Sequence, residues 1–479
     1  MDIGTQVATA LRWSTAGRLA AQILTWAVTL FVIRLLSPQD YGLMALAMVL
    51  MEFSFLLNEL GLGSAIVQRR DFDRAMAAQI LAIVLLVNGV LFVAVYLAAP
   101  LVADFYDQPA LTTLIRVLAL SLPIAALSVV PLNVLRREMR FKAKSLVDFS
   151  AAICASLTTL ALALAGLGVW ALAIGHLAGR VCTAGMALVM SRYWVWPRLS
   201  RTLHAEVFRF GGLILLNRLL FFAYNQADTL IAGRLLGAGP LGLYTVAKTL
   251  SAMPLAKVSG IVNEIGFAAF SKVKDDADAV SRHMSRVLRT TALLAFPVGI
   301  GLACVTPELV WLLLGERWLE VTRPLQIMSL AIPLRMLANV LSPAIYAIGR
   351  PGLMARYLAL SCVAMPTAFA LGAGHGLTGM ALAWITVYPL LFGVLLRMAL
   401  PVLGLGLNEF WRAIKTPCLV GIGMGAGVLG LRGILLWAGL DTWLVATLCV
   451  LAGVLLYGVG TWVSGRNHLA ELRVLLGGR

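Results

Sequence analysis

Charged side chains are scarce in this sequence of 479 residues. Asp, Glu, Lys and Arg make up 13% of it, about half of the roughly 25% found in soluble domains. Residues of the apolar set make up 61%, and the mean hydropathy is +0.91. Such a chain lacks the polar surface that a soluble protein needs, whereas helices of about 20 apolar residues suit a lipid bilayer. The composition excludes a set of soluble domains and predicts an all-α polytopic membrane protein.

Residues that carry chemistry are also few. The chain has five histidines and six cysteines, with no HExxH, CxxC or Cys/His grouping that would predict a metal centre. The cysteines all fall inside apolar runs, where we expect them to pack as small side chains. No GxxxxGK[ST] loop is present, and no nucleophile–base pair is recognisable. The sequence therefore predicts a protein that is not an enzyme, lacks an ATP motor of its own, and uses neither cofactor nor metal.

Negative charge is the third shortage. Asp and Glu number 22 against 38 Lys and Arg, which gives a formal net charge of +16. The basic residues lie in short clusters between apolar runs, which is the pattern that orients membrane helices. We therefore do not expect nucleic acid as a partner.

Apolar runs separated by charged or turn residues predict fourteen membrane-spanning helices. They cover residues 13–36, 41–60, 76–104, 111–133, 145–167, 170–191, 208–236, 242–263, 290–314, 324–348, 353–372, 377–401, 414–437 and 441–464. With the N-terminus in the cytoplasm, 26 of the 38 Lys and Arg fall in cytoplasmic segments or at the cytoplasmic ends of spans, and two, Arg317 and Arg323, lie on the opposite side. The positive-inside rule therefore predicts that both termini face the cytoplasm.

An internal repeat relates the two halves of the chain. Residues 18–50 and 218–250 are identical at twelve of 33 ungapped positions, including the segments RLLSPQDYG and RLLGAGPLG. An even number of spans separates the copies, so both halves have the same orientation and form a parallel repeat around a central cavity. We expect an N-terminal lobe over 1–207, a C-terminal lobe over 208–401, and two peripheral helices with a cytoplasmic tail over 402–479.

Paired prolines mark equivalent spans of the two halves. Pro123 and Pro131 lie in the fourth predicted span, and Pro333 and Pro343 lie in the tenth. An interior proline removes a backbone hydrogen bond and bends a helix. The bend is either a static kink or a hinge for rocking one lobe against the other.

Two motifs near the N-terminus resemble a known family. Arg34–Gly42 (RLLSPQDYG) and Glu59–Arg69 (ELGLGSAIVQR) resemble the opening of bacterial polysaccharide flippases, and Asn133–Lys142 (NVLRREMRFK) is similar to the same proteins. These are Wzx-type members of the MOP superfamily, in the colanic acid and xanthan exporter branch. The resemblance implies a bacterial inner-membrane protein with two six-helix lobes, two peripheral helices and alternating access.

Charges predicted near the middle of the membrane are mostly positive. A charge at this depth is costly and faces a cavity or a partner. The acids at this depth are Glu52 and Asp228. The cations are Arg18, Arg180, Arg218, Lys248, Lys257 and Arg335. Their excess predicts a cavity for an anionic passenger, above all a pyrophosphate, whose oxygens match Arg and Lys donors.

Helical spacing adds polar groups to this cavity. Arg18, Gln22 and Thr25 lie on one helical stripe, and Arg218 and Asn225 occupy the matching helix of the second half. We expect these five residues to bind the passenger. The alternative is interhelical pairing, for example of Arg218 with an acid on a neighbouring helix.

Three residues are candidates for coupling to a cation. Asp228 and Glu52 are expected to take up a proton or a sodium ion, or else to pair with an arginine of the cavity. His176 lies one turn before Arg180 and is either a proton site or a histidine of the packed core.

The resemblance and the charges together predict a flippase for undecaprenyl-pyrophosphate-linked oligosaccharides. Its expected partners are this lipid, a coupling H+ or Na+, membrane lipids and the polysaccharide polymerase machinery. The alternatives are a multidrug or cation antiporter of the same superfamily, which would need an acidic cavity, and a flippase of the lipid II or teichoic-acid type. A membrane polymerase is disfavoured because the predicted outer loops are short.

Overall fold

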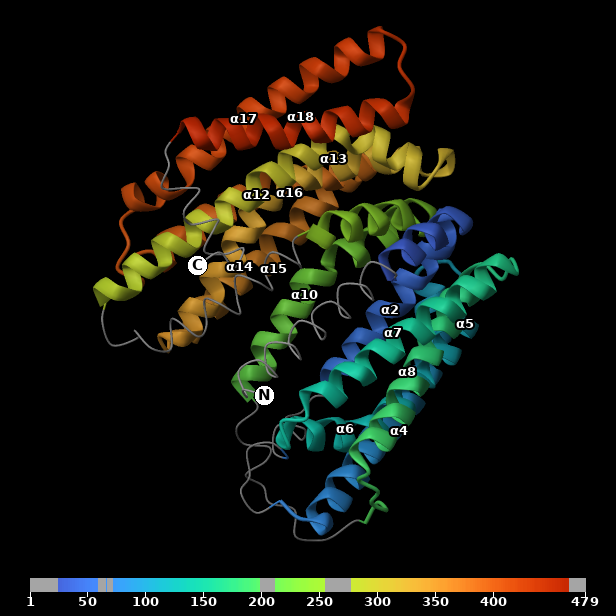
Figure 1. The fold of residues 1–479 in the computed structure, drawn as a ribbon. Helices are drawn as coiled ribbons and strands as arrows, with labels where there is room; N and C mark the ends of the chain where they lie inside the picture. Colours follow the sequence, from blue (N-terminus) through green and yellow to red (C-terminus); the bar gives the residue numbers. More distant parts are fainter. Residues whose placement is uncertain (1–24, 59–65, 67–71, 199–211, 255–276, 465–479) are drawn as a thin grey trace, which may run out of the picture. The chain divides into compact units, whose positions relative to one another are not determined.

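The structure is a computed structural model that describes residues 25–58, 66, 72–198, 212–254 and 277–464. In this part of the chain every regular element is a helix (Figure 1). The helices are α2 (Pro38–Asn58), α4 (Arg74–Phe105), α5 (Ala110–Ala119), α6 (Ser121–Arg137), α7 (Phe141–Leu164), α8 (Val169–Ser191), α10 (Gly212–Leu235), α12 (Ala277–Leu313), η1 (Glu316–Val321), α13 (Thr322–Leu330), α14 (Ile332–Ala347), α15 (Pro351–Ala373), α16 (Gly376–Ala399), α17 (Leu407–Trp437) and α18 (Thr442–Val463). Two more helices cover Thr25–Leu35 and residues 238–254.

The prediction of a multi-pass membrane protein is confirmed. Ten helices of the described residues are long and apolar enough to cross a membrane, and the bent run Glu316–Leu330 with Ile332–Ala347 makes eleven if it is one span. The other predicted spans, 13–36, 208–236 and 242–263, all run into residues outside the described part. The count of fourteen therefore stays a prediction.

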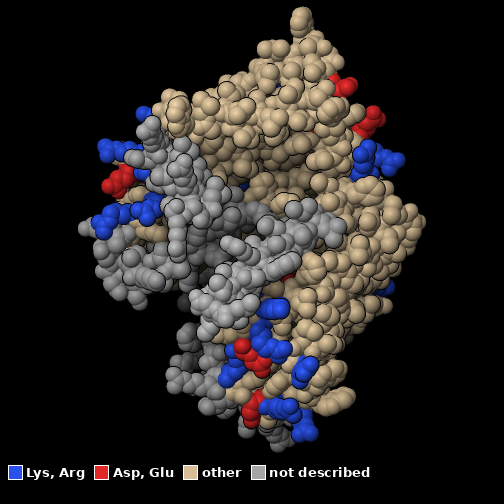
Figure 2. Space-filling view, viewed as in Figure 1, with Lys and Arg blue, Asp and Glu red and all other residues tan. Residues whose placement is uncertain are grey.

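Surface chemistry agrees with a lipid environment. Leu97 and Leu101 of α4 are 65% and 71% exposed, as expected for side chains that face acyl tails rather than water. Figure 2 shows the charges of the drawn face gathered in groups, with wide uncharged surface between them. In the sequence, exposed Arg136, Arg140 and Lys142 surround the junction between α6 and α7.

Helix α12 begins earlier than expected. It starts at Ala277 and runs without a break to Leu313, although the predicted span begins at residue 290. Val280, Met284 and Val287 are buried and recur at helical spacing, so they form one buried face of the helix. The polar residues between them belong to the same helix.

The fourth and tenth predicted spans are each divided in two. Helix α5 ends at Ala119 and α6 begins at Ser121; α13 ends at Leu330 and α14 begins at Ile332. Pro123 and Pro333 follow these breaks within three residues, where the proline ring opposes the carbonyl four residues earlier. The second break bends the helix by 47°. The predicted kink is thus present in the tenth span, and the fourth span has a break at the corresponding place. Pro131 and Pro343 lie inside the helices α6 and α14, and the use of these sites as hinges stays a prediction.

The chain divides into two compact units. Unit 1 comprises Met1–Phe222 with Gly237–Gly242, and unit 2 comprises Ala223–Leu236 with Leu243–Arg479. In unit 1, α7 packs along α8, and α4 packs against α5 and α6. In unit 2, α17 and α18 both pack against α12 (Figure 1).

Candidate functional site

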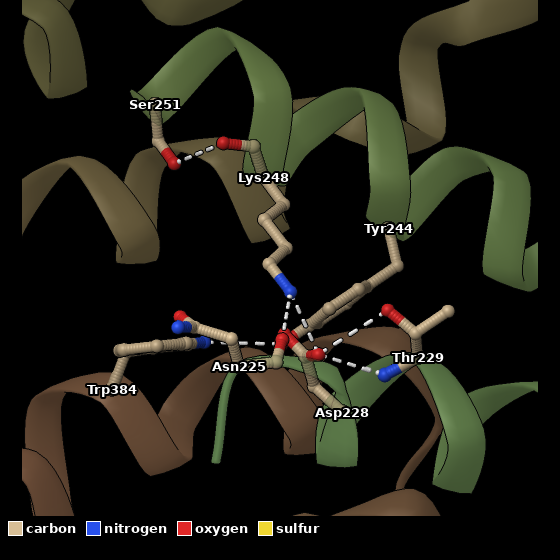
Figure 3. A network of polar contacts seen from close by, with 7 residues as sticks. All are labelled: Asn225, Asp228, Thr229, Tyr244, Lys248, Ser251 and Trp384. Carbon is tan, nitrogen blue, oxygen red and sulfur yellow. Dashed lines mark hydrogen bonds and ion pairs between the residues drawn. The ribbon is translucent and has the colours of Figure 1, made fainter. Parts of the chain in front are cut away.

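A buried carboxylate is the centre of a polar network in unit 2 (Figure 3). Asp228, in the last two turns of α10, is 1% exposed. The ammonium of Lys248, from the helix over 238–254, lies 2.8 Å from Asp228 Oδ1 and also donates to the carbonyl of Asn225 at 2.7 Å. Of the two possible roles of Asp228, ion pairing is therefore observed, with a lysine in place of the expected arginine.

Neutral donors complete the shell of Asp228. The backbone N–H and the hydroxyl of Thr229 donate to Oδ1 at 2.8 and 3.3 Å, and the Tyr244 hydroxyl donates to Oδ2 at 3.2 Å. The indole N–H of Trp384, on α16, donates to the Tyr244 hydroxyl at 3.0 Å. The buried carboxylate thus has one cation and three neutral donors as partners, as a buried charge requires.

Arg335 extends the network but lacks a carboxylate. Its guanidinium carbon lies 4.5 Å above the ring of Trp384, a cation–π contact. Its Nη1 is buried and has no hydrogen-bond partner, and Arg335 forms no ion pair with any residue of the described part. Tyr224 and Tyr388 lie within electrostatic range of it and offer phenols rather than a negative charge. Counted over the described residues, this cluster holds two cations, Lys248 and Arg335, and one carboxylate.

Unit 1 contains a second group of candidate residues. The Arg180 guanidinium on α8 lies 4.4 Å above the ring of Phe55 on α2. His176, one helical turn before it, has a buried Nε2 without a hydrogen-bond partner among the residues that the structure describes. Glu52 is exposed on α2, one turn before Phe55.

The remaining predicted residues are placed as follows. Thr25 is half-buried, and its carbonyl accepts the Thr29 hydroxyl at 2.8 Å. Arg218 is exposed on α10. Arg18, Gln22 and Lys257 lie outside the described residues. The structure therefore brings Asn225, Asp228, Lys248 and Arg335 together, and His176 with Arg180.

The sequence analysis missed a buried ion pair in unit 2. Arg432 Nε on α17 lies 2.6 Å from Glu308 Oε1 on α12, and the Glu308 side chain is 5% exposed. Both residues lie five or six positions from a helix end, outside the central positions of a span, where a charge predicts a cavity. The roles of Tyr244 and Trp384 were also missed, because an aromatic residue within an apolar run carries no signal of a hydrogen bond.

Residues 31–323 match the protein family described as "Polysaccharide biosynthesis protein". The chain is 24% identical over 323 residues to the lipopolysaccharide biosynthesis protein WzxC of Escherichia coli (strain K12). The aligned region covers 66% of this chain and 65% of that protein. It is 26% identical over 321 residues to the teichuronic acid biosynthesis protein TuaB of Bacillus subtilis (strain 168), covering 63% of each. The match thus spans just under two thirds of the length of each relative.

Solved structures share the fold. The lipid II flippase MurJ, in an inward closed conformation, superposes with a TM-score of 0.72 at 15% identity over 94% of this chain and 99% of that one. An inward-facing multidrug resistance MATE family transporter of the MOP superfamily superposes with a TM-score of 0.58 at 16% identity, over 84% and 93%. At these identities the likeness is one of architecture.

Proposed function

Because this chain belongs to the polysaccharide biosynthesis protein family, whose members are transporters and flippases rather than enzymes, we propose that it flips lipid-linked sugar units across a membrane. The passenger is an undecaprenyl-pyrophosphate-linked oligosaccharide repeat unit. It moves from the cytoplasmic to the periplasmic leaflet of a bacterial inner membrane, with both termini of the flippase in the cytoplasm. The polymerase machinery takes the unit over on the far side.

The observation that carries this proposal is the guanidinium of Arg335 on α14, which forms no ion pair with any described residue. Arg335 has no acidic partner in the part of the chain that the structure describes, and its Nη1 is buried without a hydrogen bond. The buried acids of that part, Asp228 and Glu308, are already paired with Lys248 and Arg432. A guanidinium left over in a low dielectric favours an anionic ligand.

In the mechanism we propose, Arg18 and Arg218 hold the pyrophosphate. Arg180, Lys248, Lys257 and Arg335 raise the potential around it, and Gln22, Thr25 and Asn225 supply hydrogen bonds. Two six-helix lobes alternate access to this cavity, while the last two helices remain peripheral. A proton or sodium ion acting at Asp228, Glu52 or His176 couples the cycle to an ion gradient.

A flippase of the lipid II or teichoic-acid type is the second candidate, because its passenger has the same pyrophosphate and the MurJ architecture extends over nearly the whole chain. The multidrug or cation antiporter is less favoured. A cationic drug needs an unpaired buried acid, whereas Asp228 and Glu308 each already have a cation.

The test is to delete the gene and follow the lipid-linked sugar. A periplasm-restricted glycan-modifying enzyme reports which leaflet holds the lipid, and mass spectrometry identifies its sugar. We expect the full-length repeat unit to collect in the cytoplasmic leaflet, and a plasmid copy of the chain to restore export. A peptidoglycan or teichoic-acid precursor trapped instead would favour the second candidate. Normal delivery of every lipid-linked sugar would contradict flippase activity.

A further inference from the structure

The Lys248–Asp228 pair is asymmetric in its access to a ligand. The Lys248 side chain is 24% exposed and the Asp228 side chain 1%. An ammonium has three donors, and two of those of Lys248 are used, by Asp228 and by the Asn225 carbonyl. The lysine is therefore the more accessible partner of the pair, whereas the carboxylate is enclosed by protein.

Loss of Lys248 would leave Asp228 without a cation in direct contact. Its remaining ligands, the N–H and hydroxyl of Thr229 and the Tyr244 hydroxyl, are all neutral. A buried carboxylate without a compensating charge is costly and becomes neutral by binding a proton.

Among the described residues, the other elements around Asp228 offer no second cation in direct contact with it. Tyr224 of α10 lies within electrostatic range of Asp228. Arg335 of α14 stacks on Trp384 and lies within electrostatic range of Tyr224 and Tyr244, but it forms no ion pair with Asp228. From α16 comes Trp384, whose indole does not titrate in this range and already donates to Tyr244.

We propose that an anionic group of the passenger takes Lys248 over from Asp228, and that Asp228 then binds one proton. This inference rests on the proposed function, because it requires an anionic passenger. The charges balance: the ammonium exchanges one negative partner for another, and the proton neutralises the carboxylate left behind. The occupied site therefore carries one negative charge less than the sum of empty site and passenger, which lowers the cost of holding an anion in the membrane.

The exchange predicts a specific effect of pH and of substitution. In the wild type, affinity for the anion rises as pH falls, by up to about tenfold per pH unit, because a protonated Asp228 no longer competes for Lys248. Asp228→Asn frees Lys248 permanently, so it binds the anion more tightly than the wild type at pH 8. Lys248→Gln binds weakly and releases or takes up no additional proton.

The experiment measures binding of farnesyl pyrophosphate to the full-length protein in nanodiscs between pH 6 and 8. Calorimetry in buffers of different ionisation enthalpy counts the protons taken up on binding. Asp228→Asn supplies the baseline for titration of the pyrophosphate itself, and Glu308→Gln is the matched control for removal of a buried, paired acid elsewhere in unit 2. In the wild type, an infrared band of a protonated carboxyl is expected on adding the ligand, a reading that needs no variant to fold.

We expect the wild type to take up about one proton more per bound ligand than Asp228→Asn. Equal proton uptake in the two proteins, or weaker binding by Asp228→Asn at pH 8, would overturn the exchange while leaving the proposed function intact. Absence of farnesyl pyrophosphate binding by the wild type at every pH would overturn both.

Discussion

Gly42 and Gly242 occupy the same position in the two copies of the repeat, and each lies against the first turn of the other copy's helix. A Cβ on Gly42 would overlap the carbonyl of Ala238, and a Cβ on Gly242 would overlap the carbonyl of Pro38. The two contacts are equivalent, and both lie within unit 1, where Gly237–Gly242 packs on α2. The identity of these glycines in both repeats thus has a steric cause.

We expect Gly42→Ala to lower the stability of the protein by roughly 1–3 kcal/mol, because the methyl group forces two backbone segments apart. Gly242→Ala should have a similar effect. The measurement is the thermal unfolding midpoint of the purified protein in detergent. Gly89→Ala in α4 is the control: nothing lies within 4 Å of its Cβ position. An unchanged midpoint in Gly42→Ala would contradict the close contact.

Breaking the Glu308–Arg432 pair should lower the stability of the protein by a larger amount. Arg432→Met leaves the buried Glu308 without its cation and is expected to cost about 3–5 kcal/mol. The double variant Glu308→Leu with Arg432→Met removes the stranded charge and should recover most of this loss. Lys144→Met breaks the partly exposed Lys144–Asp148 pair of α7 and should change stability by about 1 kcal/mol or less. A single variant as stable as the wild type would mean that the pair does not anchor α17 to α12.

Arg335 should matter for export more than another arginine with a similar contact. Arg335→Gln keeps the packing stem but removes the charge, and we expect polymer export to fall about tenfold or more at equal protein level, since charge-assisted hydrogen bonds contribute about 1.5–3 kcal/mol. Arg116→Gln is the matched control, because Arg116 also stacks on an aromatic ring, that of Tyr96, at 4.7 Å. Equal export by the two variants would count against an anion site at Arg335.

Loss of one hydroxyl should distinguish Tyr244 from Tyr388. Tyr244→Phe leaves Asp228 Oδ2 and the Trp384 N–H without this partner and should cost roughly 2–4 kcal/mol. Tyr388 is also buried in unit 2, but its hydroxyl makes no hydrogen bond with the described residues. The free energy of unfolding of Tyr388→Phe is therefore expected to lie within about 1 kcal/mol of the wild-type value in the same thermal assay. A larger loss of stability in Tyr388→Phe than in Tyr244→Phe would contradict the network around Asp228.

Much of the fold was accessible from the sequence because lipid imposes simple rules on each helix. The span predicted over 170–191 is α8, Val169–Ser191. The breaks near Pro123 and Pro333 agree with proline chemistry, although Pro297 and Pro307 lie inside the continuous helix α12. The start of α12 lies before the predicted span because an amphipathic segment, predicted over 275–289 as a separate short helix, continues into the span as one helix.

The site was only partly accessible, since pairing depends on how helices pack. Asp228 and Lys248 lie at similar distances from the turn at Leu236–Gly237, so an antiparallel helix pair brings them side by side, and this contact was within reach of the sequence. Glu308 and Arg432 come from helices more than a hundred residues apart in the chain. Their contact follows from tertiary packing, which no local pattern encodes.

The indole ring of Trp384 makes two contacts, one through its face and one through its edge. Its face carries the Arg335 guanidinium, and its edge donates to Tyr244. An indole has no internal rotation that could separate these contacts, so a turn of α16 about its axis disturbs both together. A rotation of α16 relative to the helices that carry Arg335 and Tyr244 would therefore break the cation–π contact and the hydrogen bond together.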